Sequence, residues 1–302
     1  GYAEGIKAPR TPNYNAVMDD GRHWMAGEGL NIDGKGMNAS VASFVDLLYR
    51  RRLATLQSVD DMIEEFVTKL DDLGVLDNTY IIYTSDNGYH LGQFGIPLDK
   101  RQPYESDLRV PMFVRGPGIP QNVTLGNSYA LNVDLAPTIL ALAGATREQI
   151  EKAAFDGRPL DRLLKTGETD RGKEFLVEYN GESWDGCTAF LSPDGIYLDE
   201  VDDGVMCGLR GPSAYRTEPR WNGTDTWSSI QDNSNNTYAC VRAIDGESDF
   251  QLCEWISGEI EAFDLATDEF QMKNLAVGMA EDELSGWTDK IEKLRSCAGA
   301  TC

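Results

Sequence analysis

A helical pattern of apolar residues, followed directly by a short β-rich run, constrains the fold of this chain most strongly. From Val41 to Leu70, apolar residues recur at spacings of three and four, as on one face of an α-helix, and Gly74 is a typical C-terminal cap. Residues 79–84 then read Thr-Tyr-Ile-Ile-Tyr-Thr without alternation, which is typical of a strand buried on both faces. A helix followed by such a strand predicts α/β layers with a parallel sheet.

The first half of the chain continues this alternation. A second strand is predicted at residues 110–115 and a helix at residues 135–143, with Asp134 as its N-cap. Residues 1–36 are rich in Gly, Pro, Asn and Asp and lack periodicity, so we expect a surface loop or a segment that lies over a site. We assign residues 1–170 to a first domain.

The pattern changes after residue 170. Short strands separated by Gly, Asp and Asn turns predict a smaller antiparallel sheet. An amphipathic helix at residues 281–296 has its apolar side chains on one stripe and is expected to cover that sheet. We therefore assign residues 171–302 to a small C-terminal domain. Its predicted strands lie at residues 175–179, 195–198, 237–243, 250–256 and 260–265.

Net charge argues against two broad classes of function. The 302 residues include 27 Lys and Arg against 50 Asp and Glu, which leaves a formal net charge of −23. Such a chain repels phosphate backbones and anionic lipids, so we expect neither nucleic acid nor a membrane as partner. Apolar runs in the sequence also fall short of the about 18 residues that a membrane-spanning helix needs.

Six cysteines and four N-x-[ST] sequons indicate an oxidising compartment on the secretory route. None of the cysteines forms a C-x-x-C pair, so disulfides are a better interpretation than a zinc site. The sequence does not choose among the possible pairings, although strand pairing favours Cys240 with Cys253 and proximity favours Cys297 with Cys302. The sequons begin at Asn38, Asn122, Asn222 and Asn235.

A dense group of polar residues follows the predicted strand at residues 79–84. Asp86 and Asn87 place a carboxylate beside an amide oxygen, and open α/β sheets bind ligands at the carboxyl ends of their strands. These donors suit calcium or magnesium better than zinc, but Asp-Asn-Gly is equally typical of an ordinary turn. His90, one of two histidines, is able to donate a proton to a leaving oxygen, although a lone histidine is more often structural.

The charged residues at positions 99–105 also have two interpretations. A solvated loop is the simpler one for Lys100 and Arg101, and the segment taken alone favours it. In the other interpretation, Lys100 lies beside a metal ion and stabilises negative charge that develops on an anionic substrate as a bond breaks.

Several separated motifs occur in a characteristic order: SDNG at residues 85–88, Lys100, YE at 104–105, RVP at 109–111 and GPG at 116–118. This order resembles the second half of the sulfatase signature. The longer strings at residues 85–94 and 99–102 are similar to the N-acetylglucosamine-6-sulfatase branch, which includes fungal and algal arylsulfatases. Residues 236–242 and 296–302 fit the same branch, so the resemblance covers nearly the whole chain.

The resemblance implies a fold and a set of site residues. The fold is an alkaline-phosphatase-like α/β sheet with helices on both faces, of which this chain holds the C-terminal part, plus a smaller C-terminal antiparallel sheet with a helix. Asp86 and Asn87 match calcium ligands, and Lys100 matches the lysine that contacts the sulfate. His90 matches a histidine for substrate or leaving-group contact, and His23 resembles a histidine near the substrate.

The chain also departs from the family. Sulfatases use a formylglycine made from the Cys or Ser of C/S-x-P-S-R, a motif that does not occur in residues 1–302. The resemblance therefore implies that an N-terminal chain of the same enzyme carries formylglycine and completes the calcium site. The expected function is removal of 6-sulfate from N-acetylglucosamine residues of glycosaminoglycans, in a lysosomal or secreted enzyme. The alternatives are an arylsulfatase acting on small aryl sulfates, a phosphomonoester or phosphonate hydrolase, and a non-catalytic calcium-stabilised subunit.

Overall fold

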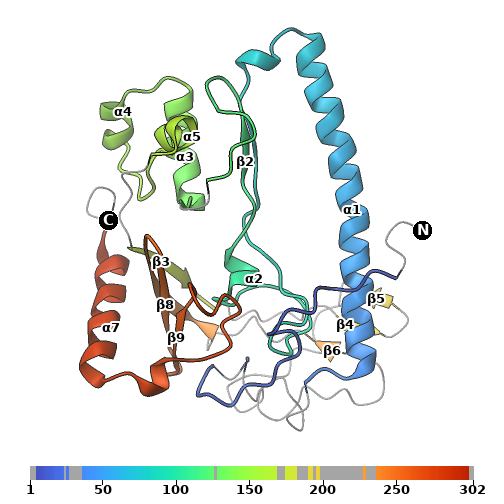
Figure 1. The fold of residues 1–302 in the computed structure, drawn as a ribbon, viewed down its shortest axis with the longest axis vertical. Coiled ribbons are helices and arrows are strands. Elements are labelled where there is room, and N and C mark those ends of the chain that lie inside the picture. The colour runs from blue at the N-terminus through green and yellow to red at the C-terminus, as the bar shows by residue number, and fades with distance from the viewer. Residues whose placement is uncertain are drawn as a thin grey trace, which may run out of the picture.

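Figure 1 shows the computed structural model of the chain. A long helix, α1, stands along one side, a group of short helices α3–α5 lies near the top on the other side, and a sheet with helix α7 lies below that group. The described residues are 5–23, 25–26, 36–125, 128–168, 174–181, 190–192, 195–197, 227–228 and 236–298.

Helix α1 (Ala39–Asp72) confirms the periodic pattern of the sequence. It begins where the side chain of Asn38 accepts a hydrogen bond from the main-chain nitrogen of Val41, which satisfies one of the unpaired donors of the first turn. It ends before Gly74, whose φ of 68° is readily adopted only by glycine. A short 3-10 turn, η2 (Leu76–Asn78), then leads into strand β1 (Ile81–Tyr83).

The strand pairing corrects one prediction. Strand β1 pairs with β2 (Phe113–Arg115) in antiparallel register, not in a parallel sheet, and the side chain of Phe113 is 65% exposed. The expected burial of residues 79–84 on both faces is also absent, because Tyr83 is exposed. An apolar run without alternation predicts that both faces of a strand are buried, but it does not indicate the direction of the neighbouring strand.

Asp134 is the N-cap residue of α3, as predicted, but its side chain does not cap the helix. Its carboxylate makes no capping bond to α3; instead Oδ2 accepts from the main-chain nitrogen of Leu131 at 2.7 Å and Oδ1 accepts from that of Arg158 at 2.8 Å. Asp134 is fully buried, and its two bonds connect the main chain at Leu131 with the main chain at Arg158. The elements of this group are η3 (Asn132–Asp134), α3 (Leu135–Leu142), α4 (Arg147–Lys152) and α5 (Asp161–Thr166). The short helix α2 (Glu105–Leu108) lies apart from them, near the middle of Figure 1.

The second half forms the predicted antiparallel sheet, in the order β3-β7-β8-β9. Helix α7 (Glu281–Ser296) covers one face, where Ile291 packs with Val241 and Leu252.

The predicted disulfide Cys240–Cys253 joins directly opposite residues of β7 and β8. Cys297 is also disulfide-bonded, while Cys302 lies outside the described residues. The strands are β3 (Glu174–Tyr179), β7 (Tyr238–Asp245), β8 (Ser248–Trp255) and β9 (Ile260–Asp264), with η5 (Ala276–Gly278) before α7; a separate small sheet has β4 (Phe190–Ser192), β5 (Gly195–Tyr197) and β6 (Trp227–Ser228).

The N-terminal segment contributes to the core of the molecule. Ala26 packs with Phe94 and Tyr104 against Phe263 and Leu265 of the C-terminal sheet region. The surface-loop interpretation is therefore wrong for the buried residues of this segment, because buried contacts with residues more than 200 positions away cannot be read from local periodicity. The alternative, a segment that lies over a site, stays a prediction. Among the described helices, none combines the length and the apolar character that a bilayer crossing requires.

Candidate functional site

The predicted metal ligands lie in a turn that directly follows β1. The Oδ1 atom of Asp86 accepts from the main-chain nitrogen of Asn87 at 2.9 Å, and the hydroxyl of Ser85 donates to the carbonyl oxygen of Asn87 at 2.8 Å. Asn132 supports the turn by donating to the carbonyl oxygen of Asp86 at 2.8 Å. These bonds fix the main chain of the turn that carries Asp86 and Asn87, just after the end of the strand.

Gly88 lets this turn lie directly against the main chain of α2. The main-chain nitrogen of Gly88 donates to the carbonyl oxygen of Asp107, and that of Tyr89 donates to Ser106, both at 2.8 Å. A Cβ atom on residue 88 would stand 2.0 Å from the carbonyl oxygen of Ser106, which no side chain tolerates. The glycine of the Asp-Asn-Gly motif is thus required by close packing of two segments.

Lys100 lies between two residues with unusual backbone conformations. Asp99 has a φ of 106° and Arg101 a φ of 88°, values that cost residues other than glycine roughly 1–3 kcal/mol each. Arg101 pairs with the carboxylate of Asp99 at 2.6 Å, and the side-chain amide of Asn236 donates to the carbonyl oxygen of Arg101 at 3.1 Å. The surroundings therefore hold a strained conformation around a single lysine.

The structure brings this lysine loop next to the predicted metal turn. The main-chain nitrogen of His90 donates to the carbonyl oxygen of Asp99 at 2.9 Å, two residues after Gly88. Lys100 is a half-buried residue of this loop. The sulfate contact predicted for Lys100 stays a prediction.

His90 is buried at 1% exposure, and both of its ring nitrogens face oxygen atoms. Nδ1 lies 2.9 Å from both carboxylate oxygens of Asp107, and Nε2 lies 3.0 Å from the carbonyl oxygen of Leu98. The leaving-group role that the sequence predicts for His90 stays a prediction, and it requires the bond to Leu98 to open.

The donor chemistry of the turn fits a hard cation in kind. Asp86 offers a carboxylate at an exposed position of the turn. The side-chain nitrogen of Asn87 donates to the carbonyl oxygen of Gly88 at 2.7 Å, so the Oδ1 atom of Asn87 is the atom that can bind a cation. Calcium takes about six to eight oxygen ligands, so two side chains supply a minority of them. Within the described residues, no group of three or more His, Cys, Asp or Glu gathers as a metal site. Other groups would have to complete the coordination.

His23 lies in the C-terminal sheet region. Its ring is fully buried and stacks on Trp255 at 4.9 Å with an angle of 8° between the planes. Its main-chain nitrogen donates to Oε1 of Glu261 at 2.7 Å. The substrate contact predicted for His23 stays a prediction.

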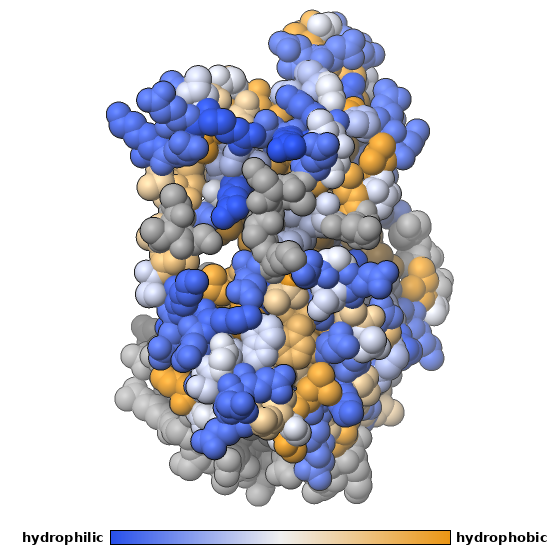
Figure 2. Space-filling view, turned by 60° about the vertical axis from the view of Figure 1, so that its left-hand side comes forward, coloured by the Kyte–Doolittle hydropathy of each residue, from blue (hydrophilic) through white to orange (hydrophobic). Residues whose placement is uncertain are grey.

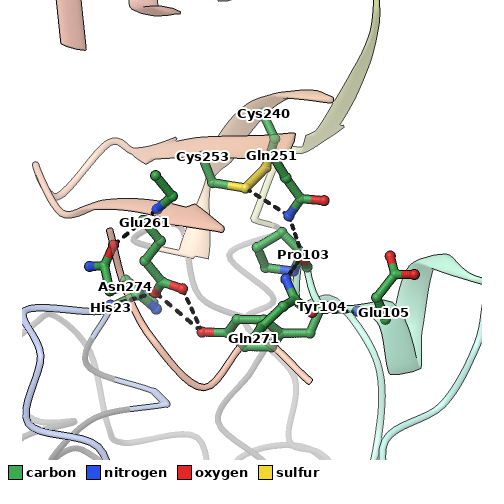
Figure 3. The surroundings of a disulfide bond; sticks show 11 residues. His23, Pro103, Tyr104, Glu105, Cys240, Gln251, Cys253, Glu261, Gln271 and Asn274 are labelled. Carbon is green, nitrogen blue, oxygen red and sulfur yellow. Dashed lines mark hydrogen bonds between the residues drawn. A yellow bond between two sulfur atoms is a disulfide. The ribbon is translucent and has the colours of Figure 1, made fainter. Parts of the chain in front are cut away.

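A buried polar interface, which the sequence analysis did not find, fixes the segment after Lys100 to the C-terminal sheet (Figure 3). Gln251 donates to the carbonyl oxygen of Pro103 at 2.6 Å, and the main-chain nitrogen of Glu105 donates to Gln271 at 2.8 Å. The hydroxyl of Tyr104 donates to Oε2 of Glu261 at 3.0 Å. The sequence does contain an indication of this interface: Gln251 and Glu261 are polar residues within otherwise apolar strands. Such residues need hydrogen-bond partners when they are buried.

Glu261 is the most perturbed acid of this interface. Full burial raises its pKa to about 7, and this effect exceeds the opposing influence of the Arg22 charge and of the hydrogen bonds from His23 and Tyr104. Arg22 pairs with Asp20 at 2.7 Å, so that an ionised Glu261 adds an unbalanced negative charge to a dry site.

The fold is that of a sulfatase. A solved structure of a protein in complex with its substrate D-glucosamine-2-N,6-O-disulfate superposes with a TM-score of 0.56 at 23% identity, covering 87% of this chain and 43% of that one. Another, described as a 2-O GAG sulfatase, superposes with a TM-score of 0.52 at 15% identity, covering 95% of this chain and 52% of that one. These similarities establish the fold class, α/β with helices and a smaller antiparallel sheet.

Residues 9–145 match the family described as Sulfatase, so this part of the chain belongs to the sulfatase family. The chain is 36% identical over 302 residues to an N-acetylglucosamine-6-sulfatase of Bos taurus, covering 99% of this chain and 48% of that protein. It is 33% identical over 274 residues to an arylsulfatase of Chlamydomonas reinhardtii, covering 86% of this chain and 36% of that protein. The chain thus spans about half the length of the first relative.

Proposed function

We propose that this chain is the C-terminal part of a sulfuric ester hydrolase that removes 6-sulfate from N-acetylglucosamine residues of glycosaminoglycans. The observation that carries the proposal is Lys100, half-buried between two residues of positive φ beside the Asp86–Asn87 turn. The 36% identity to a protein named N-acetylglucosamine-6-sulfatase and the solved complex with a glucosamine disulfate support the choice of substrate.

In this proposal Lys100 binds the sulfate group. Its ammonium charge neutralises a sulfate oxygen and stabilises the negative charge that develops as the S–O bond breaks. Asp86 and Asn87 would hold Ca²⁺, which supplies further positive charge at the sulfate when it is bound. The nucleophile, formylglycine, would come from an N-terminal portion of the enzyme.

An exposed apolar face on α1 supports the N-terminal portion as partner. Met62, Phe66 and the C-cap residue Leu73 lie on one side of the helix and are between 55% and 60% exposed. Apolar residues also remain visible among hydrophilic ones on the upper part of the face in Figure 2. Because exposed apolar patches commonly mark an interface, we propose that the N-terminal portion covers this face and completes the sheet beside β1.

We propose a lysosomal or secreted location. The disulfide Cys240–Cys253 requires an oxidising compartment, and a relative in Caenorhabditis elegans, 50% identical over 155 residues, is named a putative extracellular sulfatase homolog. The sequon at Asn122 lies in an exposed turn and is accessible to a glycan.

The test compares sulfate release from N-acetylglucosamine 6-sulfate and from an aryl sulfate by the chain assembled with its N-terminal portion and Ca²⁺. We expect preference for the sugar ester, and Lys100→Ala should lower kcat/KM by roughly 100-fold or more, because the lost charge acts in the transition state. Lys152→Ala, an exposed lysine in α4, is the matched control. Preference for the aryl ester favours the arylsulfatase alternative, which the algal relative supports. No release from either ester, with formylglycine verified by mass, favours a non-catalytic calcium-stabilised subunit.

A further inference from the structure

We infer that His90 and Asp107 form a positioning pair that holds Lys100 in place from both sides of its loop. The inference rests on the proposed function, in which Lys100 contacts the sulfate. It assigns a role to Asp107, and it gives His90 a task that needs no contact with the substrate.

His90 holds the part of the loop that precedes Lys100. Its main-chain nitrogen donates to the carbonyl oxygen of Asp99 at 2.9 Å, and its Nε2 atom lies 3.0 Å from the carbonyl oxygen of Leu98. Two consecutive carbonyl groups are therefore fixed by one residue. Asp99, which carries one of these carbonyl groups, has a positive φ. Such a conformation is unfavourable and persists only where surrounding contacts hold it.

Asp107 holds the part of the loop that follows Lys100. Its Oδ2 atom accepts from the main-chain nitrogen of Gln102 at 2.9 Å, directly after Arg101, the second residue of positive φ. The same carboxylate binds Nδ1 of His90 at 2.9 Å. The pair thus closes a continuous hydrogen-bonded frame around residues 98–102.

The frame is buried, which makes each of its bonds costly to lose. His90, Asp107 and Gln102 have exposures of 1%, 4% and 1%. Water cannot replace a lost partner at such positions, so removal of one bond leaves a buried polar group unsatisfied. Lys100 itself is half-buried and lies between the residues that the frame holds. The arrangement fixes the main chain on both sides of Lys100.

Trypsin digestion tests the frame without any enzymatic assay, because Lys100 and Arg101 are themselves cleavage sites. Asp107→Ala removes the carboxylate that serves both His90 and Gln102. Asparagine would be a weaker test, because one carboxylate oxygen, Oδ2, lies 2.9 Å from both Nδ1 of His90 and the main-chain nitrogen of Gln102. We expect cleavage after residues 100 and 101 to rise roughly tenfold or more, with cleavage after Lys152 changed less than about twofold. Asp77→Ala, at a position whose side chain is fully exposed, is the control and should digest like the wild type.

Kinetics of the assembled enzyme on aryl sulfates with leaving groups of different pKa separate positioning from proton donation. A positioning pair predicts that Asp107→Ala and His90→Gln each lower kcat/KM by one common factor, roughly tenfold, for every leaving group. It also predicts that the double variant is no worse than the single variants, since both break one frame. A loss for His90→Gln that grows with the pKa of the leaving group would show that His90 is the proton donor instead.

The two arms distinguish failure of the inference from failure of the proposed function. Unchanged digestion at residues 100 and 101 in a folded Asp107→Ala protein overturns the inference whatever the activity. If Asp107→Ala does not fold, His90→Gln is digested instead, because Gln keeps a donor toward Leu98 while it loses the Asp107 contact. If the variant is cleaved faster at residues 100 and 101 but the assembled wild-type enzyme releases no sulfate, the hydrogen-bonded frame is supported and the proposed function is not.

Discussion

Replacement of the buried acid Glu261 by glutamine should change how the stability of this protein depends on pH. The Glu261 side chain accepts from the main-chain nitrogen of His23 and from the hydroxyl of Tyr104. The groups that face it are the Arg22 charge, the Asp20 carboxylate paired with Arg22, and the Tyr104 hydroxyl. Glutamine preserves the shape and one acceptor, and it presents an amide NH₂ to the Tyr104 hydroxyl in place of the second oxygen. The cost of that exchange does not depend on pH, so the slope of stability against pH reports the loss of the titration.

The size and sign of the effect follow from the raised pKa. Glu261 titrates near pH 4.5 in the unfolded chain and at about 7 in the folded protein. At 1.36 kcal/mol per pH unit, this difference corresponds to about 3 kcal/mol of unfolding free energy. Because the folded pKa is the higher one, the contribution is complete below pH 4.5 and is lost as the pH rises through about 7.

Urea unfolding at pH values from 4.5 to 8 measures this contribution. Across that range the unfolding free energy of the wild type should fall by about 3 kcal/mol because Glu261 ionises. The Glu261→Gln variant should not show this part of the fall. Glu254→Gln, an exposed position on the neighbouring strand β8, is the matched control and should keep the wild-type slope. Equal slopes in the wild type and Glu261→Gln would refute the reasoning from burial.

Three further changes test the rest of the structure by thermal or urea unfolding. Gly88→Ala places a Cβ atom 2.0 Å from the carbonyl oxygen of Ser106, so we expect a loss of about 2–3 kcal/mol; an unchanged midpoint would mean that the two segments separate freely. Cys240→Ser should cost about 3 kcal/mol, since Cys253 then no longer closes a loop of 13 residues, and reduction of the wild type should match it. Asp134→Asn turns one acceptor of a buried carboxylate into a donor and should cost about 2 kcal/mol, whereas wild-type stability would show that the two loops do not depend on it.

The candidate site was partly accessible from the sequence. Asp86, Asn87 and Lys100 stand out as polar residues after a predicted strand, and the structure places the turn and the lysine loop side by side through the bonds of residues 88–90. Asp107 gave no signal, because its partners His90 and Gln102 are defined by a loop conformation with two positive φ values.

The sequence by itself determined the elements whose signals are local. The helix Ala39–Asp72, the strands of the C-terminal sheet and the helix Glu281–Ser296 follow from periodicity and caps. The sequence favoured the Cys240–Cys253 pairing, and the structure decided it. Only the tertiary structure decided the antiparallel pairing of β1 with β2 and the contact of Tyr104 with Glu261. These depend on residues far apart in the chain, whose burial together is favoured by the free energy of the whole core and leaves no repeating pattern in either segment.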